Sequence, residues 1–188
     1  MLADVGIVGF PNAGKSTLIS KISAAKPKIA DYPFTTIIPN LGVVTYGDGN
    51  TFVIADIPGI IEGAHKGAGL GIKFLKHIER TKLLIHMIDV SPLNERDPLE
   101  DYVKMNNEMG SFSEDLKEKP QIVVLNKTDI IQDDSLDEIT DFFKVKKVRV
   151  FSISAITGEG IPELLDEVVA RLNELDPGTT EDSESPFP

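Results

Sequence analysis

One eight-residue segment near the start of the chain has the spacing of a phosphate-binding loop. Residues 9–16 read Gly-Phe-Pro-Asn-Ala-Gly-Lys-Ser, which fits the pattern G-x-x-x-x-G-K-[ST]. The glycines let backbone N–H groups face phosphate oxygens, and a helix beginning there adds partial positive charge. Lys15 would reach the β- and γ-phosphates of a nucleoside triphosphate, and Ser16 would ligate Mg²⁺. The alternative is a glycine-rich structural turn. The predicted nucleotide contacts in this segment are Gly9, Phe10, Pro11, Asn12, Ala13, Gly14, Lys15, Ser16 and Thr17.

A second segment, residues 126–129, reads Asn-Lys-Thr-Asp and indicates which base is bound. The Asp129 carboxylate can accept hydrogen bonds from N1–H and the N2 amine of guanine. Adenine offers an acceptor at N1 and no amine at C2, so the carboxylate would stay unpaired, at a cost of a few kcal/mol. Asn126 would tie this loop to the phosphate-binding loop, and the Lys127 stem would lie along the base. An Asx-type turn after a strand is the alternative.

A third segment agrees with a guanine pocket. Residues 154–156 follow another apolar run, and their backbone N–H groups can donate to guanine O6. The predicted contacts of this segment are Ser154, Ala155 and Ile156.

Two segments have the composition of nucleotide-sensing switches. Asp56 would hold Mg²⁺ through water, and the Gly59 N–H would reach the γ-phosphate. The predicted nucleotide contacts of this segment are Asp56, Ile57, Pro58 and Gly59. Residues 59–71 contain five glycines, so one fixed shape would require a ligand contact; a merely flexible loop is the alternative.

The other predicted switch is Lys28–Asn40. Here Thr36, or alternatively Thr35, would complete the Mg²⁺ coordination; ordinary strand entry is the alternative. The predicted nucleotide contacts of this segment are Phe34, Thr35 and Thr36. The predicted metal ligands are thus Ser16, Thr36 and Asp56, and the predicted catalytic residues are Lys15, Thr36 and Gly59.

The elements that must position these segments alternate along the chain. Continuously apolar runs indicate parallel strands that helices cover on both faces. The expected strands are 5–8, 41–46, 52–55, 83–90, 121–125 and 148–153, with a hairpin turn at 47–50. The expected helices are 15–24, 70–80, 99–118, 136–143 and one beginning near Ile161. We therefore predict an α/β, three-layer P-loop NTPase fold with a six-stranded, mostly parallel sheet, one antiparallel edge strand and about five helices.

Composition limits the remaining possibilities. The chain has 188 residues, no cysteine and a formal net charge of −11. We expect one GTP-binding domain over residues 1–175 and an acidic flexible tail or linker over 176–188. With no apolar run long enough for a bilayer and no signal-peptide pattern, we expect a cytoplasmic protein without a membrane partner. Basic residues at 73, 76, 80 and 82 form either a solvated helix face or a surface for RNA or the ribosome.

The segments together resemble the GTPase domain of the bacterial Obg family. The features that carry the resemblance are the phosphate-binding loop as written above, Tyr-Pro-Phe-Thr-Thr at 32–36, and Asp-Ile-Pro-Gly-Ile-Ile-Glu-Gly-Ala-His-Lys-Gly-Ala-Gly-Leu-Gly at 56–71. The resemblance covers about residues 3–175. It implies a domain excised from a longer protein, a role in assembly of the large ribosomal subunit, and a response to starvation nucleotides such as guanosine tetraphosphate. We expect the domain itself to be monomeric.

One step of the expected chemistry lacks its usual residues. Many GTPases carry glutamine directly after Asp-x-x-Gly to orient water, but this chain has Ile60, and no arginine lies between residues 26 and 40. We therefore expect slow GTP hydrolysis, and the alternative function is a guanine-nucleotide sensor whose hydrolysis is incidental. Asn12 would help to bind K⁺ beside the phosphates, or it is only a turn residue. We interpret His65 as a loop residue and His86 as a satisfied core residue.

Overall fold

The fold is built around one seven-stranded sheet. The structure is a computed structural model, and it describes residues 3–24, 28–29, 40–47, 49–57, 79–131 and 134–176. The strands are β1 (Val5–Val8), β2 (Lys28–Ile29), β3 (Asn40–Tyr46), β4 (Asn50–Asp56), β5 (Leu83–Asp89), β6 (Gln121–Asn126) and β7 (Val150–Ile153). Their order in the sheet is β2-β3-β4-β1-β5-β6-β7. The described helices are α1 (Lys15–Ile22), α3 (Pro98–Phe112), α4 (Glu114–Lys117), the 3₁₀ turn η2 (Thr128–Ile130), α5 (Ser135–Val145) and α6 (Ile161–Leu175).

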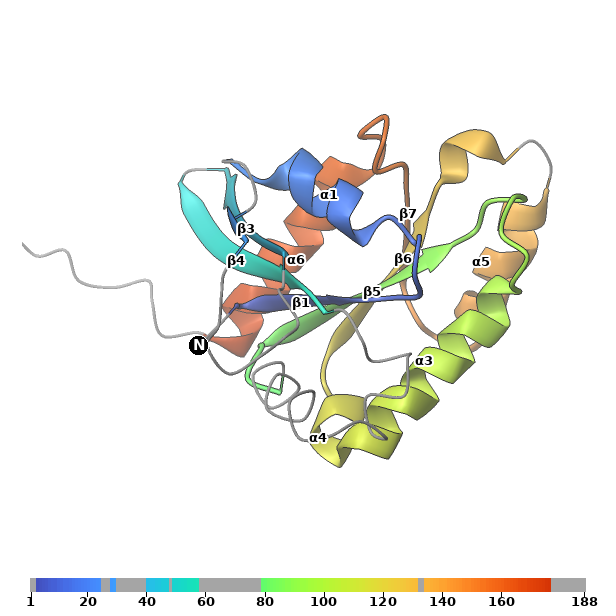
Figure 1. The fold of residues 1–188 in the computed structure, drawn as a ribbon, viewed down its shortest axis with the longest axis horizontal. Helices are drawn as coiled ribbons and strands as arrows, with labels where there is room; N and C mark the ends of the chain where they lie inside the picture. Colours follow the sequence, from blue (N-terminus) through green and yellow to red (C-terminus); the bar gives the residue numbers. More distant parts are fainter. Residues whose placement is uncertain are drawn as a thin grey trace, which may run out of the picture.

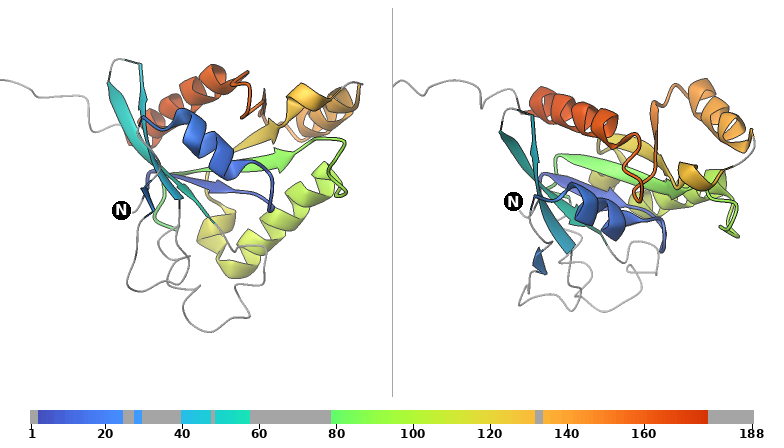
Figure 2. Two further views of the ribbon diagram at one scale, coloured as in Figure 1. Left: turned by 45° about the horizontal axis from the view of Figure 1, so that its top comes forward. Right: turned by 90° about the horizontal axis from the view of Figure 1, so that it is seen from above.

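Helices cover both faces of the sheet and make three layers (Figure 1). Alternate residues of the central strands point to opposite faces, so each face has its own apolar cluster. On one face α1 and α6 pack against Ile7, Ile85 and Val124. On the other face α3 and α4 pack against Val8 and Leu84, while α5 packs against the β5–β6 part of the sheet. The left view of Figure 2 shows α1 and α6 above the sheet and α3 and α4 below it.

The strand register gathers polar groups at one edge of the sheet. The strands β4, β1, β5, β6 and β7 run parallel, so their carboxyl ends lie together. Asp56 pairs with Ile7, and Asp89 pairs with Asn126. These three polar side chains are each at most 7% exposed, which places buried polar groups where ligands of α/β sheets bind.

The predicted strands all form, and the predicted class of fold is confirmed, with two differences in the sheet. The short strand β2 adds a seventh strand beyond the expected six. The antiparallel strand β3 consequently lies second from the edge, because it pairs with β4 on one side and β2 on the other. The hairpin turn lies where it was expected, with Gly47 and Gly49 at φ of 59° and 92°.

The prediction of a single helix over residues 99–118 is wrong, because this segment forms two helices, α3 and α4. Ser113 has extended backbone angles, with φ −161° and ψ 139°, and its hydroxyl accepts a hydrogen bond from the Leu116 N–H. It therefore ends α3 and caps α4, as serine does at helix starts. The predicted helix 70–80 lies outside the described residues except for its last two positions, which form a turn.

His86 is a satisfied core residue, as predicted. Its Nδ1 atom lies 3.1 Å from Gln121 Oε1, and its ring stacks on Tyr102. Burial lowers the pKa of His86 to about 4, so the ring is neutral at physiological pH. Lys82, from the predicted basic group, pairs with Asp4 and Asp176. Among the helices that the structure describes, none is both long and apolar enough to cross a bilayer.

Candidate functional site

The phosphate-binding loop lies between the end of β1 and the first turn of α1. Asn12 and Gly14 both have positive φ, 66° and 98°. At Gly14 a β-carbon would also collide with the side-chain nitrogen of Asn126, so only glycine fits there. The Ala13 N–H donates to the Phe10 carbonyl at 3.2 Å and closes the turn. The loop therefore has the tight backbone that the glycine spacing predicts.

Lys15 lies over this loop. Its ammonium donates to the carbonyl oxygens of Gly9 at 2.9 Å and Phe10 at 3.2 Å. Burial lowers the pKa of Lys15, and the nearby Asp56 carboxylate partly offsets that effect. A half-buried ammonium held by two carbonyls is a positive charge ready for an anionic ligand.

Asp56 and Ser16 come together next to Lys15. The Ser16 hydroxyl donates to Asp56 Oδ2 at 3.3 Å and accepts from Asn40 Nδ2 at 3.4 Å. The other carboxylate oxygen, Asp56 Oδ1, is buried and has no hydrogen-bond partner among the described residues. Burial raises the pKa of Asp56, while Lys15 and the hydrogen bonds from Ser16 and Asn40 oppose the rise.

The Ser16 hydroxyl and the Asp56 carboxylate fit the preference of Mg²⁺ for hard oxygen ligands. The unpartnered Oδ1 atom is the kind of group that a bound cation or its water would satisfy. No cluster of three acidic, histidine or cysteine side chains that could hold a metal ion occurs within the described ranges.

Asn126 joins three segments at the end of β6. Its side-chain nitrogen donates to the Ala13 carbonyl at 2.8 Å, and its side-chain oxygen accepts from the Ala155 N–H at 2.9 Å. The side chain is buried, and both bonds span long distances in sequence. The predicted tie between the 126–129 segment and the phosphate-binding loop is therefore present, and it extends to the 154–156 segment.

The rest of the base segment is fixed by different contacts. Lys127 has a left-handed backbone, with φ 72°, and its ammonium donates to Asp89 Oδ2 at 2.6 Å. The Thr128 hydroxyl donates to the Ile153 carbonyl at 3.0 Å. Asp129 lies in the exposed turn η2. Its contact with guanine stays a prediction, because only its position after Asn126 is observed.

In the 154–156 segment, the N–H groups of Ser154 and Ala155 already have hydrogen-bond partners. The Ser154 N–H donates to the Glu159 carbonyl, while the Ala155 N–H donates to Asn126 as described. Ile156 is 70% exposed, and its carbonyl accepts from Lys21 at 3.2 Å. A bond from Ala155 to guanine O6 would have to share the donor with Asn126, so that contact also stays a prediction.

Thr17 is exposed in the first turn of α1, and its predicted nucleotide contact stays a prediction. Ile57 is buried beside Val8 and Leu84, where its side chain is part of the core. Its predicted nucleotide contact is untested. The other predicted site residues lie outside the described residues: Phe34, Thr35, Thr36, Pro58 and Gly59. The same holds for Ile60 and His65.

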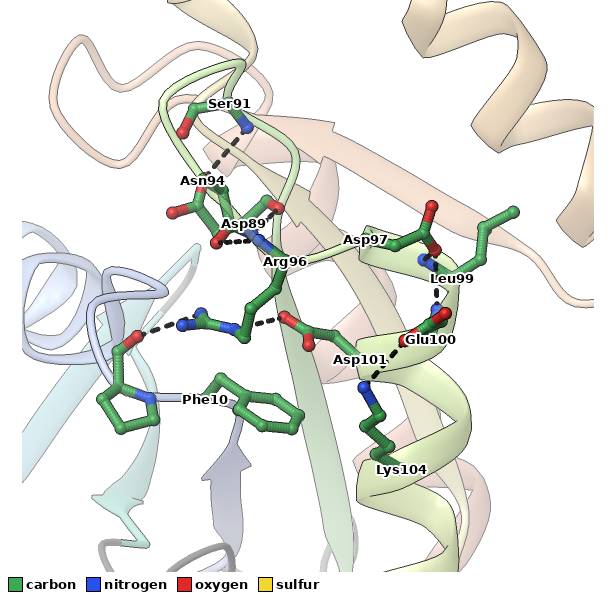
Figure 3. A network of polar contacts seen from close by, with 12 residues as sticks. Phe10, Asp89, Ser91, Asn94, Arg96, Asp97, Leu99, Glu100, Asp101 and Lys104 are labelled. Atoms are coloured by element: carbon green, nitrogen blue, oxygen red, sulfur yellow. Dashed lines mark hydrogen bonds and ion pairs between the residues drawn. The ribbon is translucent and has the colours of Figure 1, made fainter.

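Two residues that the sequence did not indicate are part of this site. Asp89, at the end of β5, is 5% exposed and holds Lys127. Arg96 reaches back to the phosphate-binding loop, where Nη2 lies 3.4 Å from the Pro11 carbonyl (Figure 3). Asp89 could have been found from the sequence, because it is an acidic residue at the end of an apolar strand; no sequence signal pointed to Arg96.

The chain is similar in sequence to proteins of a known family. The profile of the 50S ribosome-binding GTPase family matches residues 4–127. The chain belongs to this family. Proteins named GTPase Obg are similar: that of Alkaliphilus metalliredigens is 55% identical over 177 residues, which are 94% of this chain and 42% of the relative. That of Bdellovibrio bacteriovorus is 55% identical over 182 residues, 92% of this chain and 53% of the relative.

The chain spans about half the length of the curated relatives it matches. Among solved structures, the G domain of the T. maritima FeoB iron transporter superposes with a TM-score of 0.65 at 23% identity, covering 89% of this chain and 96% of that one. This likeness concerns the fold alone.

Proposed function

We propose that this chain is the guanine-nucleotide-binding domain of an Obg-type GTPase, a switch that binds GTP and GDP with Mg²⁺ and hydrolyses GTP slowly. The observation that carries the proposal is the pair of hydrogen bonds in which the Asn126 side chain donates to the Ala13 carbonyl and accepts from the Ala155 N–H. These bonds hold the phosphate-binding loop, the base segment and the 154–156 segment next to one another, which supports one shared nucleotide site. The names of the relatives and of the family support the same activity.

Each group in the site has a role in this proposal. Backbone N–H groups of the phosphate-binding loop and the Lys15 ammonium bind the phosphates, and Asp129 selects guanine. Ser16 and Asp56, with Thr36, would hold Mg²⁺. When bound, the metal would neutralise phosphate charge during transfer. Gly59 would bond the γ-phosphate.

Hydrolysis in the isolated domain is slow in this proposal. Ile60 stands where glutamine orients water in many GTPases, and it can neither donate nor accept a hydrogen bond. Positioning by Lys15 and the metal ligands is then the main source of rate. Asn12 is exposed in the phosphate-binding loop, and we propose that it helps to bind K⁺ there.

Binding of fluorescent GDP to the chain, with and without Mg²⁺, tests the function. We expect Mg²⁺-dependent binding that GTP competes and ATP does not. Asp129→Asn should shift the preference from guanine toward xanthine nucleotides, because the amide can donate to the xanthine O2. A folded chain that binds neither GDP nor GTP would refute the proposal, and unchanged guanine affinity in the variant would refute the role of Asp129.

We also propose a role in large ribosomal subunit assembly, in the cytoplasm, with a monomeric domain that accepts guanosine tetraphosphate. The family description and the Obg names support this role. The second candidate is a nucleotide sensor with incidental hydrolysis, which the isoleucine at position 60 favours. Single-turnover GTP hydrolysis with and without 50S subunits separates the two. Acceleration supports the switch, whereas an unchanged slow rate supports the sensor.

A further inference from the structure

The loop between β5 and α3, residues 90–97, links the base side of the site to the phosphate side. At its start, the Asp89 carboxylate holds the Lys127 ammonium, and the Asp89 carbonyl accepts from Asn94 Nδ2 at 3.0 Å. The Asn94 side-chain oxygen then accepts from the Arg96 N–H at 3.3 Å. The backbone of Arg96 is thus tied to the end of β5 (Figure 3).

The side chain of Arg96 continues this path to the phosphate-binding loop. Its Nη2 donates to the Pro11 carbonyl at 3.4 Å, and its guanidinium carbon lies 5.0 Å from the centre of the Phe10 ring. A guanidinium over an aromatic face is attracted to it, and a bond from a charged donor is stronger than a neutral one. Arg96 therefore contacts two successive residues on the outer side of the loop.

Arg96 is itself held by α3. Its Nε donates to Asp101 Oδ2 at 3.0 Å, and the Asp101 side chain is only 3% exposed. The other oxygen, Asp101 Oδ1, is buried with no hydrogen-bond partner in the described part of the chain. A buried carboxylate in this position depends on its ion pair with Arg96, because an unpaired buried charge is costly. The pair therefore fixes the guanidinium where it meets Pro11.

The loop needs such support because of its backbone. Asn12, directly after Pro11, has φ 66°, a conformation that costs a non-glycine residue about 1 kcal/mol. Pro11 and Asn12 are exposed on the surface of the site. Without an external contact, this half of the loop would sample other conformations, and nucleotide binding would have to restrict them.

We propose that Arg96 is a positioning residue: together with Asp89 and Asn94 it forms a bracket that fixes the phosphate-binding loop and slows nucleotide release. The inference rests on the proposed guanine-nucleotide binding. The bracket runs from Lys127, on the base side, to Pro11, on the phosphate side. Arg96 acts through the loop backbone and does not need to touch the nucleotide.

The test is the dissociation rate of fluorescent GDP from the full chain, measured beside the melting temperature of the ligand-free protein. We expect Arg96→Ala to raise the dissociation rate by about threefold to tenfold. Without Arg96, the phosphate-binding loop is free to leave its bound conformation, which favours nucleotide release. The matched control is Arg149→Ala. Arg149 also pairs with a carboxylate, Glu167, and lies over a phenyl ring, Phe151, but at the other edge of the sheet. Its loss should leave GDP release unchanged.

Arg96→Lys separates geometry from charge. Lysine keeps the positive charge but cannot bond Asp101 and Pro11 through one planar fork. The bracket predicts fast release in this variant as well, whereas release at the unaltered rate would overturn it in favour of a general electrostatic effect. If Arg96→Ala fails to fold, Arg96→Lys decides the matter alone.

A double-mutant cycle tests the continuity of the bracket. Asn94→Ala cuts the path in the middle while it leaves both ends in place, so we expect an increase in GDP release that is not additive with that of Arg96→Ala. Additive effects would overturn a continuous bracket. If the unaltered chain binds no GDP, the proposed function fails; if it binds GDP and Arg96→Ala releases it at the rate of Arg149→Ala, only the bracket fails.

Discussion

The base half of the site (residues 126–129 and 154–156) and the phosphate half (residues 9–17 with Asp56) differ in how many of their polar groups have partners within the protein. In the base half, Asn126, Lys127, Thr128 and Ser154 are all hydrogen-bonded within the chain. In the phosphate half, Asp56 keeps a buried oxygen without a partner among the described residues. Burial shifts the pKa of Asp56 up and that of Lys15 down, so both charges are disfavoured there.

This difference shows which half is preorganised and which half a ligand must finish. Satisfied buried hydrogen bonds hold the base loops in one arrangement before any nucleotide arrives. The phosphate half carries unfavourable charge burial that phosphate and Mg²⁺ would relieve. A switch benefits from this division, because one end can retain the nucleotide while the other responds to the γ-phosphate.

The largest expected effect comes from breaking the preorganised half at its centre. Asn126→Ala would leave the Ala13 carbonyl and the Ala155 N–H buried without their partner, at about 2–4 kcal/mol of unfolding free energy. We expect GDP affinity to fall by about 100-fold or more, since the two halves lose their tie. Urea unfolding and GDP titration measure the two effects, with the exposed Asn50→Ala as control. A stability loss no larger than that of the control would mean that the base half is not held by Asn126.

The next effect is a pH dependence of the unfolding free energy that comes from the core and not from the site. His86 has a folded pKa of about 4 against 6.5 in the unfolded chain, so the unfolded state binds more protons between these values. Its contribution to stability is present above pH 6.5 and is lost as pH falls toward 4, by about 3 kcal/mol in total. Urea unfolding at several pH values should show this slope.

A variant identifies the source of that slope. His86→Gln removes the titrating ring, which stacks on Tyr102 in the core, so its unfolding free energy should be lower but flatter in this window. An equal slope in both proteins would assign the acid sensitivity to groups other than His86.

A smaller effect, of opposite sign, should come from the phosphate half. The pKa of Asp56 is raised above 3.8, so the folded state holds the proton more tightly, and stability falls as pH rises through the folded pKa. Asp56→Asn removes this buried charge and should stabilise the ligand-free chain by on the order of 1 kcal/mol. The same variant should lose the Mg²⁺-dependent part of GTP binding. A variant that is less stable and still responds to Mg²⁺ would contradict the view that this half awaits a ligand.

The sequence predicted the two halves unequally, for physical reasons. The strands could be predicted because a strand covered on both faces is continuously apolar, as in β5 and β6. The tie through Asn126 could also be predicted, since its position at a strand end and its side-chain chemistry agree. The helix break at Ser113 could not, because serine within a helical pattern does not reveal that its hydroxyl caps a second helix.

The contacts made by Arg96 and Asp89 were beyond sequence reasoning. Arg96 meets Pro11 across 85 positions, and Lys127 meets Asp89 across 38. Such pairs depend on which strands are neighbours and on the path of a loop, and neither periodicity nor composition records that path. The strand β2 has only two residues, too few for any alternation to show.

The smallest expected effect concerns Asn12, on the rim of the phosphate half. Its φ of 66° suits glycine better than asparagine, so Asn12→Gly should preserve the turn and change stability by no more than about 0.5 kcal/mol. If the Asn12 side chain helps to bind K⁺, the variant should keep its GTP turnover in Na⁺ and lose the stimulation by K⁺. Turnover in the two salts, for both proteins, measures this. Stimulation that persists in the variant would leave Asn12 as a turn residue only, and the phosphate half would then bind its cations without it.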